Sequence, residues 1–396
     1  MFTRKEFSLI KQRVTEPRRF IQVVLGPRQI GKTTVVRQVL ETLDAPSLYY
    51  SADAVAAADA SWLSSCWETA RVEYAKGEGK DFLLVIDEIQ KVPNWSETVK
   101  REWDADTWNA RSIKLLLLGS SRALVMSGLS ESLTGRFEEI RMTHWTYSEM
   151  HEAYGTSLDQ YIWYGGYPGA AFLIPDQIER WKAYIQSSVI DSTVNRDVLE
   201  DGHIANLALL RKTLELGIAY SGKILSLTKL LGQLQDRGNV STIAGYLEKL
   251  NTCGLLGTLS KYSNDEARKK ASIPKFQVHN SALLAACSAL SFEEARAKPD
   301  LWGRAVESAV GAYLISQSFR SRFGVSYWRE GDKEVDFVLS VRGKTIALEV
   351  KSNGEKRSAG LSLFQEKFRP NRCLVVGEGG LSLESFFELD PVALAD

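Results

Sequence analysis

The eight residues Gly26–Thr33 constrain the fold of this chain more than any other segment. They read GPRQIGKT and fit the pattern G-x-x-x-x-G-K-[ST], in which glycines let backbone N–H groups close around phosphate oxygens. An apolar run at Phe20–Leu25, typical of a buried strand, precedes the loop, and a helical pattern at Thr34–Thr42 follows it. Because strand, loop and helix come in this order, the sequence predicts a phosphate-binding P-loop within an α/β domain.

The residues of this loop have distinct predicted roles. Lys32 can reach the β and γ phosphates, and Thr33 can offer its hydroxyl to a magnesium ion. The positive end of the following helix adds to the attraction for phosphate. The residues expected to contact the nucleotide are Gly26, Pro27, Arg28, Gln29, Ile30, Gly31, Lys32, Thr33 and Thr34. We expect ATP with Mg²⁺, while GTP stays open because the choice of base has no motif of its own here.

A second apolar run, Phe82–Ile86, ends in two carboxylates, Asp87 and Glu88. Such a run is typical of a buried parallel strand. A carboxylate at its tip can hold Mg²⁺, and the next one can orient the attacking water. The pair therefore predicts a Walker B arrangement, with Asp87 on the metal and Glu88 as the base, in preference to a merely solvated acidic pair.

Three more apolar runs predict the rest of a parallel sheet. They lie at Ser47–Ser51, Lys114–Ser120 and Phe137–Met142, with helical patterns between most of the strands. The Lys114–Ser120 run ends in small polar residues beside the expected nucleotide site. Ser120 or Ser121 can therefore sense the γ-phosphate, although a simple strand-end turn explains either serine equally well.

Charge and cysteine usage restrict the class of protein. The 396 residues include 49 basic and 49 acidic side chains, so no global field draws the chain to nucleic acid or membrane. Four cysteines lie far apart, which is typical of reduced thiols in the cytoplasm. No apolar stretch approaches the roughly 18 residues that span a bilayer, and the first residues lack a signal-peptide core. We therefore expect a soluble cytoplasmic protein with no membrane partner.

The patterns divide the chain into four expected parts. Residues 1–143 form the P-loop core, and residues 144–201 form a helical lid or connector. Residues 202–300 are expected to form a winged-helix-like domain, because short helical patterns precede a glycine turn and a hairpin. In residues 301–396 the order helix, strand, strand, helix, strand predicts a small separate domain. The expected fold class is α/β.

The winged-helix segment is the candidate DNA contact. If Val240–Leu250 is a recognition helix, Asn239, Ser241 and Thr242 can hydrogen-bond base edges or phosphates. A basic cluster follows and can lie on a phosphate backbone. Its members are Lys261, Arg268, Lys269, Lys270 and Lys275. A packing module with a solvated basic hairpin explains the same residues equally well.

The C-terminal part carries a second set of candidate residues. Glu334–Leu339 and Ile346–Lys351 are strand patterns, which hold Asp336 in the first and Glu349 and Lys351 in the second. Residues i and i+2 of a strand share a face, so Glu349 and Lys351 project together, and a hairpin can bring Asp336 beside them. Two carboxylates can bind Mg²⁺ or Mn²⁺, and a lysine can activate water or stabilise a phosphorane-like transition state.

Two further residues extend this candidate site. Glu307, in the helical pattern Trp302–Ser316, is a candidate extra metal ligand, and Gln365, on a later helical pattern, can contact a substrate backbone. The alternative is a pair of amphipathic strands with solvated ends.

Five strings of the sequence resemble those of a known family. They are GPRQIGKTT, VIDEIQ, LLLLGSS, SLTGRFEEI and YGGYP, in the order found in that family. The chain resembles, over nearly its whole length, prokaryotic AAA-type ATP-binding proteins with a C-terminal domain of unknown function. The resemblance implies a core of AAA+ or STAND-like type, then a winged helix, and a C-terminal domain similar to a PD-(D/E)XK nuclease. The proline of that nuclease motif is absent, since Val335 precedes Asp336, but the proline is not a ligand.

The resemblance also implies roles for single residues. Lys32 and Thr33 are implied to bind phosphate and magnesium. Asp87 and Glu88 are implied as the Walker B pair, and Ser120 as the sensor position. Arg136 is implied as the arginine that meets a γ-phosphate, in its own chain or in a neighbour, because a planar guanidinium binds phosphate oxygens bidentately. The alternative for Arg136 is a surface arginine at a helix end.

These inferences leave three functions open. The first is an ATP-hydrolysing protein whose nucleotide state controls a nuclease-like domain that binds DNA and cuts it. The second is an ATP-dependent switch or scaffold in which the nuclease fold is catalytically silent. The third is a transcription regulator built on the winged helix. The expected partners are ATP, DNA and further copies of the chain in a homo-oligomer.

Overall fold

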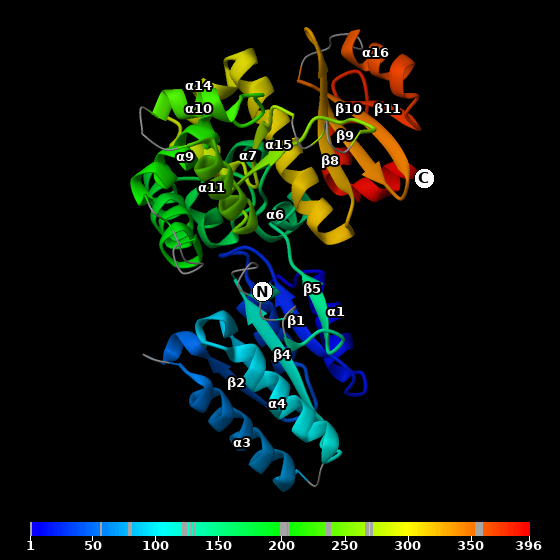
Figure 1. Ribbon diagram of the computed structural model, residues 1–396. Helices are drawn as coiled ribbons and strands as arrows, with labels where there is room; N and C mark the ends of the chain where they lie inside the picture. The colour runs from blue at the N-terminus through cyan, green and yellow to red at the C-terminus, as the bar shows by residue number, and fades with distance from the viewer. Residues whose placement is uncertain are drawn as a thin grey trace. The chain divides into compact units, whose positions relative to one another are not determined.

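The computed structural model describes residues 2–55, 58–77, 81–120, 125–126, 129, 132–198, 204, 206–234, 239–265, 269, 272–352 and 359–396 (Figure 1). The chain divides into two compact units, Met1–Met142 and Thr143–Asp396. Three residues of interest, Ser121, Arg268 and Lys270, lie outside the described residues.

The first unit is built on a five-stranded parallel sheet. Its strands are β1 (Ile21–Leu25), β2 (Ser47–Ser51), β3 (Phe82–Asp87), β4 (Ile113–Gly119) and β5 (Phe137–Arg141). Their order is β2-β3-β4-β1-β5, and every neighbouring pair is parallel. The predicted α/β class with a parallel-sheet core is confirmed, and each predicted strand boundary lies within one residue of the observed one.

Helices cover this sheet, so its central strands are buried. The helices are α1 (Glu6–Thr15), α2 (Lys32–Glu41), α3 (Ala60–Lys76) and α4 (Trp95–Trp108), with 3₁₀ turns η1 (Ala52–Ala54) and η2 (Ile89–Lys91). Figure 1 shows α3 and α4 together over one face of the sheet. Burial of β1, β3 and β4 along their whole length explains why they are continuous apolar runs.

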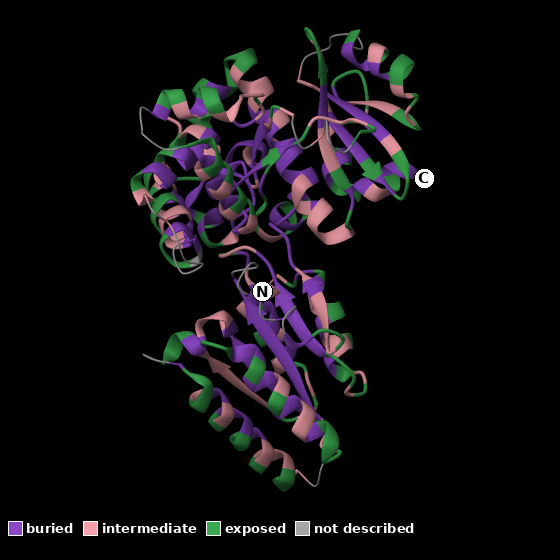
Figure 2. Ribbon diagram, in the orientation of Figure 1, coloured by how far each residue is buried: buried purple, intermediate pink, exposed green. Residues whose placement is uncertain are grey.

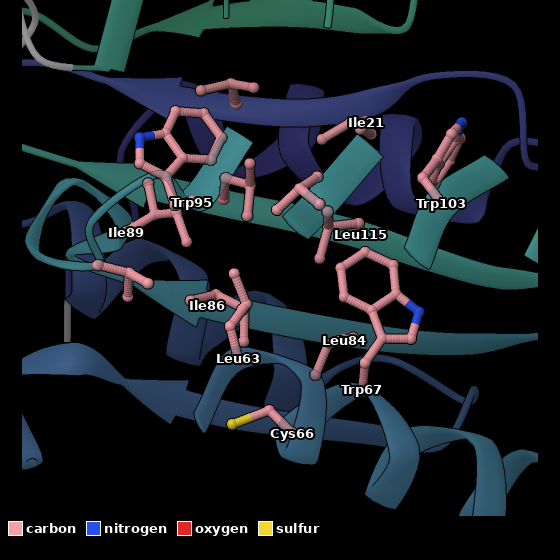
Figure 3. Close-up of a cluster of buried hydrophobic side chains, with 14 of the residues drawn as sticks. Ile21, Leu63, Cys66, Trp67, Leu84, Ile86, Ile89, Trp95, Trp103 and Leu115 are labelled. Atoms are coloured by element: carbon pink, nitrogen blue, oxygen red, sulfur yellow. The ribbon is translucent and has the colours of Figure 1, made fainter. Parts of the chain in front are cut away.

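Tryptophans fill the core between this face and its two helices (Figure 3). Trp67 of α3 and Trp95 and Trp103 of α4 pack against alternate residues of the strands, such as Ile21 and Leu115. The alternation follows from the pleat of a strand, which sends successive side chains to opposite faces. This packing fixes the strands whose carboxyl ends carry the candidate nucleotide site.

The second unit begins with helices. They are α6 (Tyr147–Tyr154), α7 (Leu158–Tyr164), α8 (Ile178–Tyr184), α9 (Leu207–Ala219), α10 (Leu227–Leu234) and α11 (Val240–Thr252), with η3 (Pro168–Leu173) and the π-helical η4 (Ile185–Asp191) and η5 (Val194–Val198). An antiparallel pair of strands, β6 (Leu256–Leu259) and β7 (Lys275–Val278), follows α11. Two short helices, α13 (Ala282–Cys287) and α14 (Phe292–Arg296), come next.

The chain ends in a four-stranded sheet with helices. Its elements are α15 (Pro299–Ser321), β8 (Gly324–Glu330), β9 (Lys333–Val341), β10 (Lys344–Lys351), α16 (Ala359–Phe368), β11 (Arg372–Gly377), α17 (Leu383–Glu388) and η6 (Pro391–Ala395). The strand order is β11-β10-β9-β8, with β10 and β11 parallel and the other pairs antiparallel. Figure 2 shows β9 and β10 largely buried, and Trp328 and Phe364 belong to the core beside them.

Within the part of the chain that the structure describes, no helix is both long enough and apolar enough to cross a bilayer.

Candidate functional site

The P-loop lies between the end of β1 and the start of α2. Gly31 has φ 88°, a left-handed conformation that glycine adopts without steric cost, and the helix begins at the next residue, Lys32. At Gly26 a Cβ atom would lie 2.5 Å from the Met142 carbonyl oxygen and 2.7 Å from the Ile30 side chain. Both motif glycines are therefore required by backbone geometry as well as by the closeness of a phosphate.

Lys32 is held over this loop by backbone carbonyls. Its Nζ donates to the oxygens of Gly26 and Pro27, both at 2.8 Å, and the residue is buried. Among the remaining loop residues, Ile30 is buried, Arg28 is half-buried, and Gln29 and Thr34 are exposed. The lysine side chain thus folds back across the loop that carries it.

The loop meets the end of β3 through Thr33. Its Oγ1 donates to Asp87 Oδ2 at 2.8 Å, and Tyr49 of β2 donates to the same oxygen at 2.6 Å. Burial, together with the hydrogen bond to Asp87, raises the pKa of Tyr49, so the phenol keeps its proton and remains a donor. A hydroxyl and a carboxylate side by side fit the oxygen ligands that Mg²⁺ takes.

Glu88 lies beside the end of β4. It has φ 53°, an uncommon conformation for a residue with a side chain. Ser120 Oγ donates to Glu88 Oε2 at 2.9 Å, Gln90 Nε2 donates to Ser120 Oγ at 3.2 Å, and Gln90 also donates to Glu88. The structure therefore brings Glu88 and Ser120 together, as the order of parallel strands β3 and β4 requires.

Gln90 and Tyr49 were missed from the sequence. Gln90 lies two residues beyond Glu88 and is positioned by η2, which the sequence pattern did not indicate. Tyr49 sits inside a strand pattern in which aromatic residues are common for packing alone. The only available signal for either was closeness to the Walker B carboxylates, and for Tyr49 that closeness depends on β2 pairing with β3.

Arg136 lies near the amino-terminal end of β1, at the end of the strands opposite the P-loop. Its carbonyl accepts from the N–H of Ile21 at the start of β1, whereas the P-loop follows the end of that strand. The five residues of β1 separate the two edges by about 13 Å at about 3.3 Å per residue. Arg136 is instead paired with Asp104 of α4, at 2.8 Å and 3.0 Å. Of the two alternatives left open for Arg136, its own chain or a neighbour, strand direction places it away from the P-loop of its own chain.

The C-terminal candidate residues lie on neighbouring strands, with Asp336 on β9 and Glu349 and Lys351 on β10. Val350 N donates to Asp336 Oδ2 at 2.8 Å, and Lys351 Nζ lies 3.1 Å from Glu349 Oε1. Burial and then the charge of Glu307 raise the pKa of Asp336 to about 7. Gln365 lies exposed on α16.

Lys275 of β7 occupies the middle of these carboxylates. Its Nζ lies 2.6 Å from Glu307 Oε1, 3.1 Å from Glu334 Oε1 and 4.0 Å from Asp336 Oδ1. Burial by itself lowers the pKa of Lys275, but the charges of Glu307, Asp336 and Glu334 outweigh it and raise that pKa. We call Glu307, Glu334 and Asp336, which surround Lys275, the carboxylate cluster.

This arrangement corrects one expectation, the placement of Lys275, and bears on a second, the metal site. Lys275 was expected with the basic residues that face a phosphate backbone, yet its side chain is fully buried, because the charge of each carboxylate favours an ammonium at this position. For Glu307, Asp336 and Glu349, the metal site stays a prediction: among the described residues there is no group of three or more His, Cys, Asp or Glu side chains that could hold a metal ion.

The polar side chains at the start of the candidate recognition helix hydrogen-bond to its own N-cap residue, Asn239. Asn239 Oδ1 accepts from Thr242 N at 2.7 Å, from Ser241 Oγ at 2.7 Å and from Thr242 Oγ1 at 2.8 Å. The bond from Thr242 N satisfies one of the free N–H groups at the start of α11, and the other two bonds join side chains of the same turn. The elements α9, α10, α11, β6 and β7 do follow in the order expected of a winged helix.

Family models match three consecutive stretches of the chain. Residues 18–151 match a model described as AAA domain, residues 155–294 match Domain of unknown function (DUF8612), and residues 302–387 match Domain of unknown function (DUF4143). No curated protein sequence matches the chain.

Solved structures show distant similarity. The Aeropyrum pernix ORC1 protein in complex with DNA is 14% identical, with 74% of this chain and 93% of that chain covered and a TM-score of 0.31. The Thermotoga maritima RuvB Holliday junction branch migration motor is 19% identical, with 64% and 87% covered and a TM-score of 0.35. The stretch that matches the AAA domain model, residues 18–151, contains the P-loop and the strands of the five-stranded parallel sheet.

Proposed function

We propose that the first unit hydrolyses ATP with Mg²⁺. The observation that carries the proposal is the hydrogen bond between Thr33 and Asp87, which joins the P-loop to the end of β3. Thr33 and Asp87 are the residues that would hold Mg²⁺, which when bound offsets charge on the β and γ phosphates. The AAA family match supports the same activity.

The residues around the site suggest a division of work. Lys32 is placed on the loop to offset phosphate charge, and Glu88 is the base that orients the attacking water and accepts its proton. Ser120 and Gln90 hold the Glu88 carboxylate through hydrogen bonds. We propose that Ser120, rather than acting as a free sensor, positions Glu88.

ATP hydrolysis by Lys32→Ala and Glu88→Gln tests this proposal. Glu88→Gln keeps the shape of the side chain but not its basicity, so we expect kcat to fall by about 10²–10⁴ while ATP still binds. We expect Lys32→Ala to lose hydrolysis as well. The control is Glu41→Gln, an exposed carboxylate at the far end of α2. Wild-type-like hydrolysis in Glu88→Gln would refute the assignment of the base.

For Arg136 we propose action on the γ-phosphate of a neighbouring subunit. The support is its position at the edge of the sheet away from its own P-loop. A guanidinium in a half-exposed ion pair with Asp104 can exchange that partner for phosphate at low cost. The protein would then act as a homo-oligomer, with each site completed by the next copy.

For the second unit we propose that the nucleotide state changes its arrangement, and that its catalytic residues are silent in the described state. The position of Lys275 within the carboxylate cluster supports this switch interpretation. The convergence of Asp336, Glu349 and Lys351 supports the rival proposal, cleavage of DNA by a PD-(D/E)XK-like domain after a winged helix has bound it.

A cleavage assay separates these two proposals. Wild type and Asp336→Ala are incubated with single- and double-stranded DNA, Mg²⁺ or Mn²⁺, with and without ATP. The switch proposal predicts no cleavage in any sample while ATP is hydrolysed. Cleavage that requires Asp336 would replace it with the nuclease proposal.

A further inference from the structure

Lys275 is a lysine without solvent contact whose ammonium faces carboxylates from two directions. Glu307 approaches it from α15, while Glu334 and the backbone carbonyl of Asp336, at 3.3 Å, approach from β9. Lysines are almost never fully buried unless they are paired. Burying the Lys275 ammonium costs desolvation free energy. The question is therefore what its positive charge does at this position.

The position of Lys275 is imposed by the docking of its hairpin. The hairpin, by which we mean β6, β7 and the described residues 260–262 and 272–274, pairs by backbone with β8: Tyr327 N donates to Ser260 O at 3.1 Å, and Tyr262 N donates to Tyr327 O at 2.6 Å. The Tyr327 hydroxyl also donates to the carbonyl of Ile273. These bonds hold the strand that carries Lys275 against the C-terminal sheet.

The close approach of α15 fixes the opposite side of the cluster. At Gly311 a Cβ atom would lie 2.2 Å from Gln277 Oε1 and 2.9 Å from the Phe337 ring, so a larger residue here would require these side chains to shift. Gln277, fully buried, donates to Ser308 O at 2.8 Å. Glu307, next to Ser308, is thereby held against Lys275, and the pairing is built by packing from both elements.

The carboxylates outnumber the ammonium groups in this region, so its net negative charge favours bound cations. The carboxylates of Glu307, Glu334, Asp336 and Glu349 face the ammonium groups of Lys275 and Lys351. Carboxylate oxygens are the ligands that hard divalent cations prefer. Without Lys275, the oxygens of Glu307 and Asp336 would face one another with no neutralising charge, which is the condition that draws a metal ion.

We propose that the Lys275 ammonium takes the place of a divalent cation and keeps the carboxylate cluster free of metal while this hairpin is docked on β8. The hairpin is thus a built-in block on metal chemistry at Asp336. The proposal is independent of ATP hydrolysis in the first unit, and it concerns the chain without nucleotide or nucleic acid.

Binding of Mn²⁺ to the full chain without nucleotide tests the proposal. The proteins compared by electron paramagnetic resonance are wild type, Lys275→Met, Lys275→Arg and the double variant Lys275→Met/Asp336→Asn. We expect Lys275→Met to gain one Mn²⁺ site at least tenfold tighter than any site of wild type. The double variant should lose that site, and Lys275→Arg, which keeps the charge, should not gain it.

A second comparison decides the matter even if Lys275→Met does not fold. Wild type and Asp336→Asn both keep Lys275, so the proposal requires their Mn²⁺ titrations to coincide. A site in wild type that disappears in Asp336→Asn would overturn the proposal, as would a folded Lys275→Met that gains no site. Where Lys275→Met folds, its melting temperature should rise with Mn²⁺, and that of wild type should not.

Discussion

Thr33 and Asp87, 54 positions apart in the sequence, are joined by a hydrogen bond of 2.8 Å. The bond links the first turn of α2 to the last residue of β3, so the two motifs form one site rather than two coincident patterns. Asp87 also accepts from Tyr49, which gives this carboxylate a fixed orientation before any ligand arrives. The predictions below start from this arrangement.

Removal of the hydrogen bonds to Glu88 should slow hydrolysis without weakening ATP binding. In Ser120→Ala and Gln90→Leu the Glu88 carboxylate loses a donor, so we expect kcat to fall about 10-fold or more in each, with KM nearly unchanged, since positioning acts mainly on the chemical step. Steady-state ATPase kinetics check this. The double variant should cost less than the product of the single effects, because both residues act through Glu88. A change confined to KM would contradict a positioning role.

Arg136→Ala should lose ATP hydrolysis and recover it on mixing with Lys32→Ala. Each variant lacks one part of a site shared between subunits, so a mixed oligomer contains intact sites made from both. ATPase activity of the two proteins, alone and mixed in equal amounts, checks this. Arg19→Ala, an exposed arginine of the same unit, is the matched control. No recovery in the mixture, with oligomers present, would exclude action between subunits.

Gly26→Ala should weaken the first unit as well as ATP binding. The added Cβ would lie 2.5 Å from the Met142 carbonyl oxygen, so the P-loop or β5 must shift. Overpacking of this kind costs about 1–3 kcal/mol. Chemical denaturation of the protein without nucleotide measures the cost. A stability equal to wild type would show that the loop relaxes freely and that Gly26 serves only the phosphate.

Asp106→Ala should destabilise the first unit by about 3–5 kcal/mol, because removing one partner of a buried ion pair leaves the other uncompensated. Asp106 is fully buried and accepts from Trp67 Nε1 at 2.6 Å and from Arg71 Nε at 2.8 Å. Urea unfolding followed by tryptophan fluorescence measures the loss. Asp44→Ala, at an exposed turn, should change the free energy of unfolding by less than about 0.5 kcal/mol.

Local patterns predicted the strands of the first unit closely. The run Phe82–Asp87 is the observed β3, and Ser47–Ser51 is the observed β2. Continuous apolar runs identify strands that are buried on both faces. The P-loop could be recognised from the sequence because its phosphate-binding residues are consecutive. In the second unit, strands β9 and β10 extend only a few residues beyond their predicted ends.

Contacts between side chains that are far apart in the sequence could not be predicted from local patterns. The opposite placement of Arg136 and the P-loop depends on β1 and β5 pairing in parallel, and the burial of Lys275 depends on its hairpin docking against β8. A lysine among other basic residues looks like a surface residue until packing surrounds it with carboxylates. The sequence by itself determined the local elements and the nucleotide motif, since both arise from neighbouring residues. Only the tertiary structure decided which charges meet, because long-range packing sets the distances on which electrostatic pairing depends.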